Sequence, residues 1–376
     1  MAGAGLPDQA IPSGGRLVHI GFDKTGTTSL QGAFHSDRER LREHGVLYPG
    51  NERYHKSAGI AITNARGNTG DAPVTMGAWR DLVSEVKAAR SSRVFVSSEW
   101  LCRATDEQAR LVVRGLGGDR VRVVATLRPL SKILPSAWQQ YVKDGYVGDY
   151  ESWLRDTLST TTPGPPTPWF WIRHRHDVVL QRWAKLVGSS NVTAIVVDSR
   201  DHDLLFRQFE ALLALPAGFL VAKPESASNA SLTWPEAELL RQVNLHFQAE
   251  QLSDELYSRA VRSGVLPRLA ASRAELANPV PIPTPTWALE RAAEIGATAA
   301  AAIDASGIHV LGDLASLGAV PSSSDESDPS REPAVDFATA AQAIVGVIAG
   351  TKAERPPRPA PSRWRRTRRI DPLPEF

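Results

Sequence analysis

Residues 17–28 read Leu-Val-His-Ile-Gly-Phe-Asp-Lys-Thr-Gly-Thr-Thr, a short apolar run followed at once by a turn of glycine, threonine and one lysine. The apolar run predicts a buried strand. Leu30, Ala33 and Phe34 share one face of a helical pattern that starts directly after the turn. A strand, a glycine turn and a helix N-terminus bring backbone N–H groups and the positive end of the helix dipole to one point. The stretch therefore predicts an anion-binding loop.

The chain around this loop alternates between strand and helix patterns. Capping-box sequences at Thr105–Gln108 and Thr233–Glu236 mark the starts of two helices. The alternation predicts an α/β fold: a P-loop-like three-layer sandwich with a central, mostly parallel sheet flanked by helices. Beyond residue 245 the chain reads as helical and Ala-rich, which predicts a helical C-terminal extension. The further strands are expected at 94–96, 121–127 and 191–197.

Composition describes an ordinary soluble chain. Of 376 residues, 42% are hydrophobic and 22% charged, with a net charge of +2. The single cysteine, Cys102, excludes an intramolecular disulfide and a cysteine-based metal cluster, and fits a reducing compartment. Residues 1–15 lack the pattern of a secretory signal, and no stretch approaches the ~18 apolar residues that span a bilayer. We therefore expect a cytoplasmic protein.

The loop differs from that of nucleotide kinases. Gly21 and Gly26 have the glycine spacing of the kinase loop, but Thr27 follows Gly26 where that loop requires lysine. The lysine, Lys24, comes two residues before Gly26 instead. A P-loop kinase or NTPase is thus the disfavoured alternative, and a Gly/Thr turn without a ligand is a second one.

The order Lys-Thr-Gly-Thr-Thr after a strand resembles the 5'-phosphosulfate loop of PAPS-dependent sulfotransferases of the bacterial type (PAPS is 3'-phosphoadenosine 5'-phosphosulfate). That family usually has proline where this chain has Asp23, which sets an acid beside the anion site unless its side chain points outward. The resemblance implies that Lys24 stabilises the bridging and leaving oxygens, and that no metal is needed. It implies a donor 5'-end held by Lys24, Thr25, Gly26, Thr27 and Thr28.

A second motif follows about 100 residues later. Arg128 ends the predicted strand at 121–127, and Ser136 lies eight residues on. In the sulfotransferase family such a pair binds the donor's 3'-phosphate, and a guanidinium fork suits a phosphate. Pro135 suits an early helical position. The alternative is a strand-end arginine in a surface ion pair.

The base is left open between two residues. Glu99 ends the strand at which cytosolic members of the family carry their catalytic histidine, and it could instead pair with Arg103. His55, in the polar loop 51–57, is the second candidate, and it could equally be a solvated loop histidine. The acceptor is expected to be a hydroxyl or amine of a carbohydrate, glycolipid or small metabolite.

The acceptor side is less specific. The segment 160–176 carries prolines, Trp169-Phe170-Trp171 and a run of Arg and His. It either lines an acceptor cleft or is tucked onto the core by its tryptophans. Lys143 is a candidate to face the same cleft. The residue that stacks on adenine is open, and Trp138 reads better as core.

The predicted organisation has four parts. Residues 1–15 are expected to be disordered, and 16–318 to form the sulfotransferase domain, with the resemblance over 16–245 and the helical extension over 246–318. A linker at 319–335 precedes a short helix and an Arg/Pro-rich tail at 336–376. The seven arginines at 355–369, with Trp364 among them, suggest contact with an anionic membrane surface or simply a solvated tail; no nucleic-acid partner is expected. A non-catalytic binding protein that retains the fold is the remaining alternative, and Asp23 is its best argument.

Overall fold

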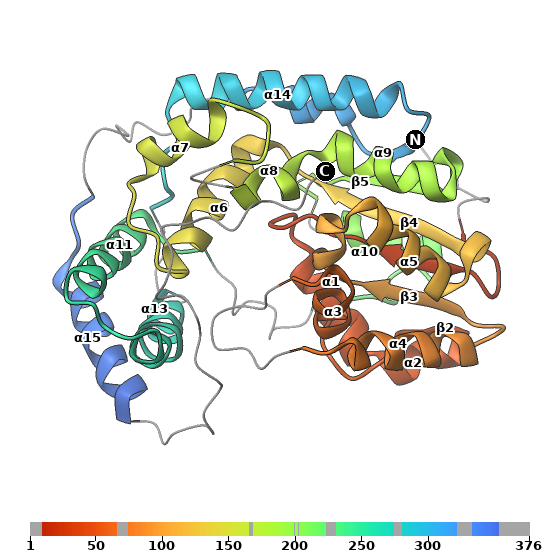
Figure 1. Ribbon diagram of the computed structural model, residues 1–376, viewed down its shortest axis with the longest axis horizontal. Coiled ribbons are helices and arrows are strands. Elements are labelled where there is room, and N and C mark those ends of the chain that lie inside the picture. The colour runs from red at the N-terminus through yellow and green to blue at the C-terminus, as the bar shows by residue number, and fades with distance from the viewer. Residues whose placement is uncertain are drawn as a thin grey trace.

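The computed structural model describes residues 10–65, 74–164, 168–198, 200–201, 203–222, 231–273, 280–321 and 333–352, with the backbone alone at 168–169. Its centre is a six-stranded sheet of order β2-β3-β1-β4-β5-β6 (Figure 1). Every neighbouring pair is parallel. The strands are β1 (Arg16–His19), β2 (Val46–Leu47), β3 (Arg93–Ser97), β4 (Val121–Leu127), β5 (Val192–Val196) and β6 (His309–Leu311).

Helices cover both faces of the sheet, which confirms the predicted three-layer α/β fold (Figure 1). Successive strand residues point to opposite faces, so Leu17 packs in one layer and Val18 in the other. The Leu17 layer buries Phe34 and Phe209 from the helices above it. These helices are α1 (Thr27–Ser36), α2 (Arg38–Glu43) and α10 (Leu204–Leu213). The Val18 layer is covered by α3 (Lys56–Thr63), α4 (Met76–Ala88), α5 (Asp106–Leu116), α9 (His176–Val187) and α14 (Thr286–Asp304).

A second group of helices lies to one side of the sheet, at the left of Figure 1. Its core is aromatic, with Trp138, Trp153 and Trp171 fully buried. Trp138 donates from Nε1 to Gly148 O at 3.2 Å, as expected of a core residue. The group consists of α6 (Leu130–Lys143), α7 (Tyr150–Leu158), α8 (Pro168–His174), α11 (Trp234–Ala249), α12 (Asp254–Tyr257), a π-helical turn (Ser258–Val265), α13 (Leu266–Arg273) and α15 (Phe337–Lys352).

Two predicted boundaries are corrected by the structure. Order begins before Arg16, because Ile11 is only 4% exposed and its N–H donates to Leu212 O at 2.9 Å. Residues 246–318 are more than a helical extension, because β6 pairs with β5 and α14 packs on α9. Both predicted capping boxes are present, at α5 and at α11.

The C-terminal region is described only in part. The helix expected near Phe337 is α15, which packs on the π-helical turn. Most of the predicted linker (322–332) and the arginine tail lie outside the described residues, as do residues 1–9. Within the part of the chain that is described, no helix is long and apolar enough to cross a bilayer.

Candidate functional site

The loop after β1 is shaped by two glycines and one strained lysine. Gly21 has φ +81°, and a Cβ placed there would lie 2.5 Å from Glu99 Cα, so only glycine lets the loop pass this close to β3's end. Gly26, at φ +80°, caps α1 without a side-chain hydrogen bond. Lys24 has φ +67°, which is rare for a residue with a side chain. Such backbone is concentrated at ligand-binding sites, where surrounding contacts hold it.

A chain of hydrogen bonds fixes the loop from below. Thr25 Oγ1 donates to Phe22 O at 2.8 Å and lies 2.7 Å from Thr126 Oγ1 on β4. His19 links Thr126 Oγ1 (3.4 Å from Nε2) to Ser97 Oγ (2.8 Å from Nδ1). Burial lowers the pKa of His19 to about 3, so the imidazole is neutral. Three strands therefore hold Thr25. Sequence reasoning missed this network, whose one signal was polar residues inside apolar strands.

The two sequence motifs meet at Lys24. Arg128 Nη1 donates to Lys24 O at 3.0 Å, which also secures the strained backbone. Lys24 Nζ donates to Gln140 Oε1 on α6 at 3.1 Å. Ser136 lies one helical turn before Gln140, so the same face of α6 is turned toward the loop. Burial lowers the pKa of Lys24, while the carboxylates of Asp23 and Glu99 oppose that shift.

The helical setting of Ser136 differs from the expectation. α6 begins at Leu130, directly after Pro129, so Ser136 belongs to its second turn. Pro135 is inside the helix and not at its start. Because proline has no N–H, the helix lacks one internal hydrogen bond at this point. Ser136 itself is half-buried.

Asp23 points inward and not outward. Its Oδ2 lies 2.9 Å from Arg173 Nη1 and 3.5 Å from Arg103 Nη2, and all three side chains are mostly buried. Burial alone would raise the pKa of Asp23, but Arg173 and then Arg103 lower it to about 2. The acid that replaces the usual proline is thus neutralised by two arginines. Arg103, the residue considered as a partner for Glu99, pairs with Asp23 instead.

Glu99 starts the 3₁₀ turn Glu99–Arg103 at the end of β3 and lies directly against Gly21. Burial and the neighbouring Asp23 raise its pKa, whereas Lys24 and two arginines lower it, and the result is about 7. A half-buried carboxyl that titrates near neutral pH suits a general base. The structure therefore places this candidate beside the anion loop.

Both ring nitrogens of His55 are engaged by backbone groups, so the side chain is not available as a base. Its Nδ1 accepts from Ser97 N–H at 3.0 Å, and Nε2 lies 2.9 Å from Pro49 O. Burial lowers the pKa of His55 to about 4, so the ring is neutral with both nitrogens bonded to backbone. His55 ties the loop before α3 to β3, which corrects its reading as an alternative base.

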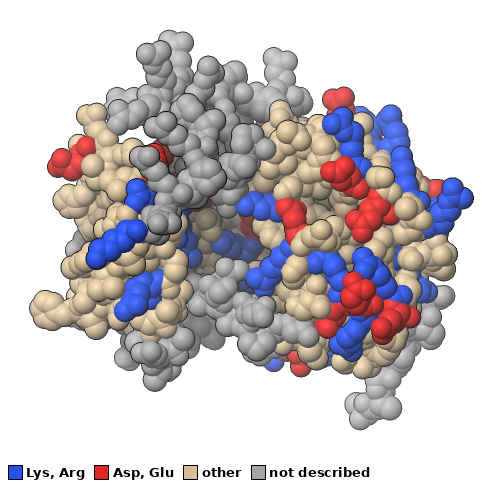
Figure 2. Space-filling view, turned by 90° about the horizontal axis from the view of Figure 1, so that it is seen from below, with Lys and Arg blue, Asp and Glu red and all other residues tan. Residues whose placement is uncertain are grey.

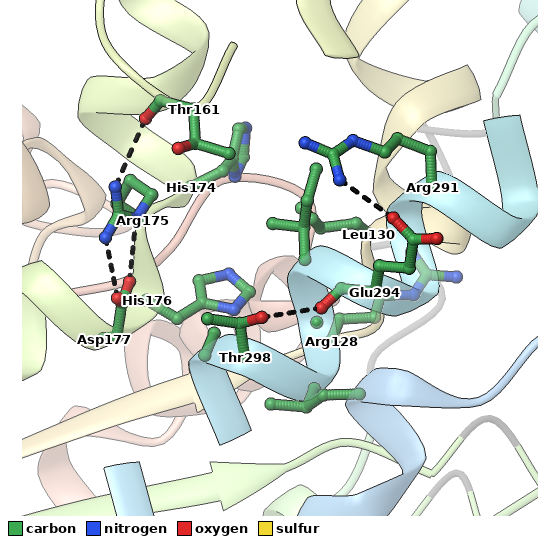
Figure 3. Close-up of a pocket in the computed structure, with 14 residues that line it drawn as sticks. Arg128, Leu130, Thr161, His174, Arg175, His176, Asp177, Arg291, Glu294 and Thr298 are labelled. Atoms are coloured by element: carbon green, nitrogen blue, oxygen red, sulfur yellow. Dashed lines mark hydrogen bonds and ion pairs between the residues drawn. The ribbon is translucent and has the colours of Figure 1, made fainter. Parts of the chain in front are cut away.

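The segment 160–176 divides between core and pocket. Phe170 and Trp171 are buried, and Trp171 Nε1 donates to Thr157 O at 2.8 Å, as the core alternative expects. The Trp169 side chain lies outside the described residues. A pocket of about 380 Å³ is lined by four residues of the segment, together with Arg128 and one face of α14 (Figure 3). The four are Thr161, His174, Arg175 and His176.

The pocket walls carry paired charges and two buried histidines. Arg175 makes two bonds to Asp177, at 3.0 and 2.8 Å, and Arg291 pairs with Glu294 on α14 (Figure 3). His174 Nδ1 and His176 Nε2 are buried without a hydrogen-bond partner among the described residues. Sequence reasoning missed the α14 side, because residues 286–304 carry no motif.

Lys143 lies close enough to Lys24 for the two charges to interact. Lys143 is half-buried at the end of α6, three residues beyond Gln140, and burial together with the charge of Lys24 lowers its pKa to about 8. Figure 2 shows Lys and Arg side chains gathered around a hollow near the centre of the face that it views. That Lys143 faces an acceptor cleft remains a prediction.

Within the described ranges, no group of three His, Cys, Asp or Glu side chains is placed to hold a metal ion. No family model matches the chain, and no curated protein matches it. Among solved structures, it is similar to a sulfotransferase from Alicyclobacillus acidocaldarius, with 16% identity, 66% of this chain and 99% of the other covered, and a TM-score of 0.39. A similarity of that size carries no argument about function, which rests on this chain's own residues.

Proposed function

We propose that the protein is a sulfotransferase that moves a sulfuryl group from PAPS to an acceptor hydroxyl or amine. The observation that carries the proposal is the convergence at Lys24. Residues about 100 positions apart, Lys24 and Arg128, are in direct contact, and Lys24 also bonds to Gln140, one helical turn after Ser136.

The groups present fit a donor with phosphates at two ends. The N–H groups of Gly26, Thr27 and Thr28 open α1, where the helix dipole favours an anion, and they would hold the 5'-phosphate. One N–H of the Arg128 guanidinium donates to Lys24 O. Its other N–H groups would donate to the 3'-phosphate, and Ser136 would add a hydroxyl.

In the proposed reaction the acceptor oxygen or nitrogen forms a bond to sulfur, and the bond from sulfur to the bridging 5'-phosphate oxygen breaks. The electron pair of that bond stays on the phosphate, where Lys24 stabilises the charge. The acceptor proton passes to the Glu99 carboxylate. As in phosphoryl transfer, rate acceleration would come from positioning and charge stabilisation plus this proton transfer.

The two rival functions are less well supported. A kinase needs its lysine directly after Gly26, whereas Lys24 lies two residues before Gly26 and bonds to Gln140. The case for a non-catalytic protein rested on Asp23, which is paired with Arg173 and Arg103. A carboxyl held near a pKa of about 7 beside the loop favours an enzyme.

The proposal is tested by calorimetric binding of 3'-phosphoadenosine 5'-phosphate (PAP), the desulfated donor. We expect micromolar binding, weakened about 10- to 100-fold in Arg128→Ala, because charge-assisted hydrogen bonds are lost. Lys24→Ala should also weaken it. Arg122→Ala is the matched control, because Arg122 lies on β4, the strand that Arg128 follows, and its side chain donates to Asp119 O. Absence of PAP binding, or a preference for ATP, would refute the proposal.

A further inference from the structure

Helix α15 presents an apolar face to solvent. Phe337 is 95% exposed, Ile344 62%, Ile348 47% and Val345 44%. Phe337, Ile344 and Ile348 are separated by whole helical turns, so with Val345 they form one stripe along the 16-residue helix. Exposed apolar stripes of this kind mark interaction surfaces.

The opposite face of α15 is locked to the protein by glycines. A Cβ on Gly346 would lie 2.8 Å from Val265 Cα, and one on Gly350 would lie 2.1 Å from Arg259 O. The two backbones therefore meet with no room for a side chain between them. Because these contacts fix the rotation of the helix, it cannot turn its apolar stripe inward without giving them up.

Basic residues adjoin α15 at its C-terminal end and on the side that packs on the protein, and Asp336 directly precedes Phe337. No charged residue occurs from Phe337 to Thr351, and Lys352 ends the helix. On the neighbouring helices, Arg268 bonds to Gln342 at 2.5 Å and Arg259 bonds to Thr351 O. The sequence that follows has seven arginines and no acid between 355 and 369.

We propose that α15 docks this stripe onto an anionic lipid bilayer, lying in the plane of the interface, and that the charge of the arginine-rich sequence after the helix favours anionic headgroups. Apolar area that inserts shallowly, combined with a basic segment, supplies the two signals that stable peripheral binding needs. A second copy of the chain is a less well supported partner for this stripe. One helix of this length offers about 240 Å² (~24 Å by ~10 Å), well short of the ~800 Å² per partner of a stable dimer.

The test is co-sedimentation of the full chain with phosphatidylserine/phosphatidylcholine vesicles and with phosphatidylcholine vesicles alone. We expect binding to the anionic vesicles that falls with salt, and little binding to the neutral ones. Ile344→Ser/Ile348→Ser should weaken binding about tenfold, because two apolar side chains no longer insert. Leu252→Ser/Val280→Ser is the matched control, because those side chains are 43% and 47% exposed outside the stripe.

Three results would overturn the docking proposal. The first is absence of binding to anionic vesicles. The second is unchanged binding of Ile344→Ser/Ile348→Ser alongside complete loss in a chain that ends at Lys352, which would assign the contact to the arginines alone. The third is a dimer in light scattering without vesicles that the double variant dissociates. PAP binding should be equal in all variants, so the outcome is independent of the proposed catalysis.

Discussion

Burial raises the pKa of Glu99 more than the nearby positive charges lower it. Burial and Asp23 favour its protonated form, whereas Lys24, Arg103 and Arg173 favour the carboxylate. A carboxyl with an ordinary pKa would be ionised but weakly basic, and one far above neutrality would hold its proton. In the proposed reaction, a pKa of about 7 would let the group take the acceptor's proton at neutral pH.

We therefore expect kcat/KM to rise with pH through about 7, because only the deprotonated Glu99 can act as base. Glu99→Gln should lower kcat/KM by about 10²- to 10⁴-fold and remove this rise. A pH–rate series on both proteins measures it, with Glu107→Gln, an exposed glutamate on α5, as the control.

The Asp23→Asn variant provides a second test of Glu99 in the same pH–rate series. Asp23 raises the pKa of Glu99, so its neutral substitute should move the rise in kcat/KM to lower pH. A wild-type profile that is flat between about pH 6 and 8, or full activity in Glu99→Gln, would remove Glu99 from the proposed role.

At the level of elements, the loop is held by strands on both sides of β1. β3 supplies Ser97 and β4 supplies Thr126, and His19 on β1 joins them. The strained φ of Lys24 can persist because these bonds and Arg128 surround it. Binding geometry at the loop thus depends on the register of a parallel sheet.

Thr126→Val should destabilise the protein by about 1–3 kcal/mol and weaken PAP binding. Valine has the same shape but no hydroxyl. His19 Nε2 and Thr25 Oγ1 would therefore each lose their contact with Thr126 Oγ1. Urea unfolding with and without PAP measures both effects. Thr193→Val, a half-buried threonine on β5, controls for the substitution itself. Equal stability of Thr126→Val and wild type would show that the network does not hold the loop.

The sequence predicted those parts of the site that are local. The loop at 21–28 and its flanking strand and helix are encoded within one short segment, so their pattern could be recognised. The partners of Asp23 could not, because Arg103 and Arg173 follow 80 and 150 residues later. Local pattern carries no information on such pairs. β6 was missed for a different reason: with three residues it is too short to show an alternation.

Over the whole molecule, α14 and β6 are part of the sheet domain and not an appendage. α14 packs against α6, α7 and α9, so it joins the sheet to the helical group, and β6 covers the edge of β5. Ile303 is fully buried in the sheet layer, and Ile295 is buried among the helices. Each such side chain contributes about 1.5–3 kcal/mol when buried.

Two truncated chains test this organisation. A chain of residues 1–321 keeps α14 and β6, and we expect it to unfold cooperatively and to bind PAP like the full protein. A chain of residues 1–273 loses both elements, exposes the β5 edge and uncovers the apolar faces of α6 and α9, so we expect aggregation and no PAP binding. Thermal unfolding followed by circular dichroism, with calorimetry, distinguishes the two. If the shorter chain folded and bound PAP, α14 and β6 would be dispensable to the site, and the Arg128 side of the pocket would not depend on its α14 wall.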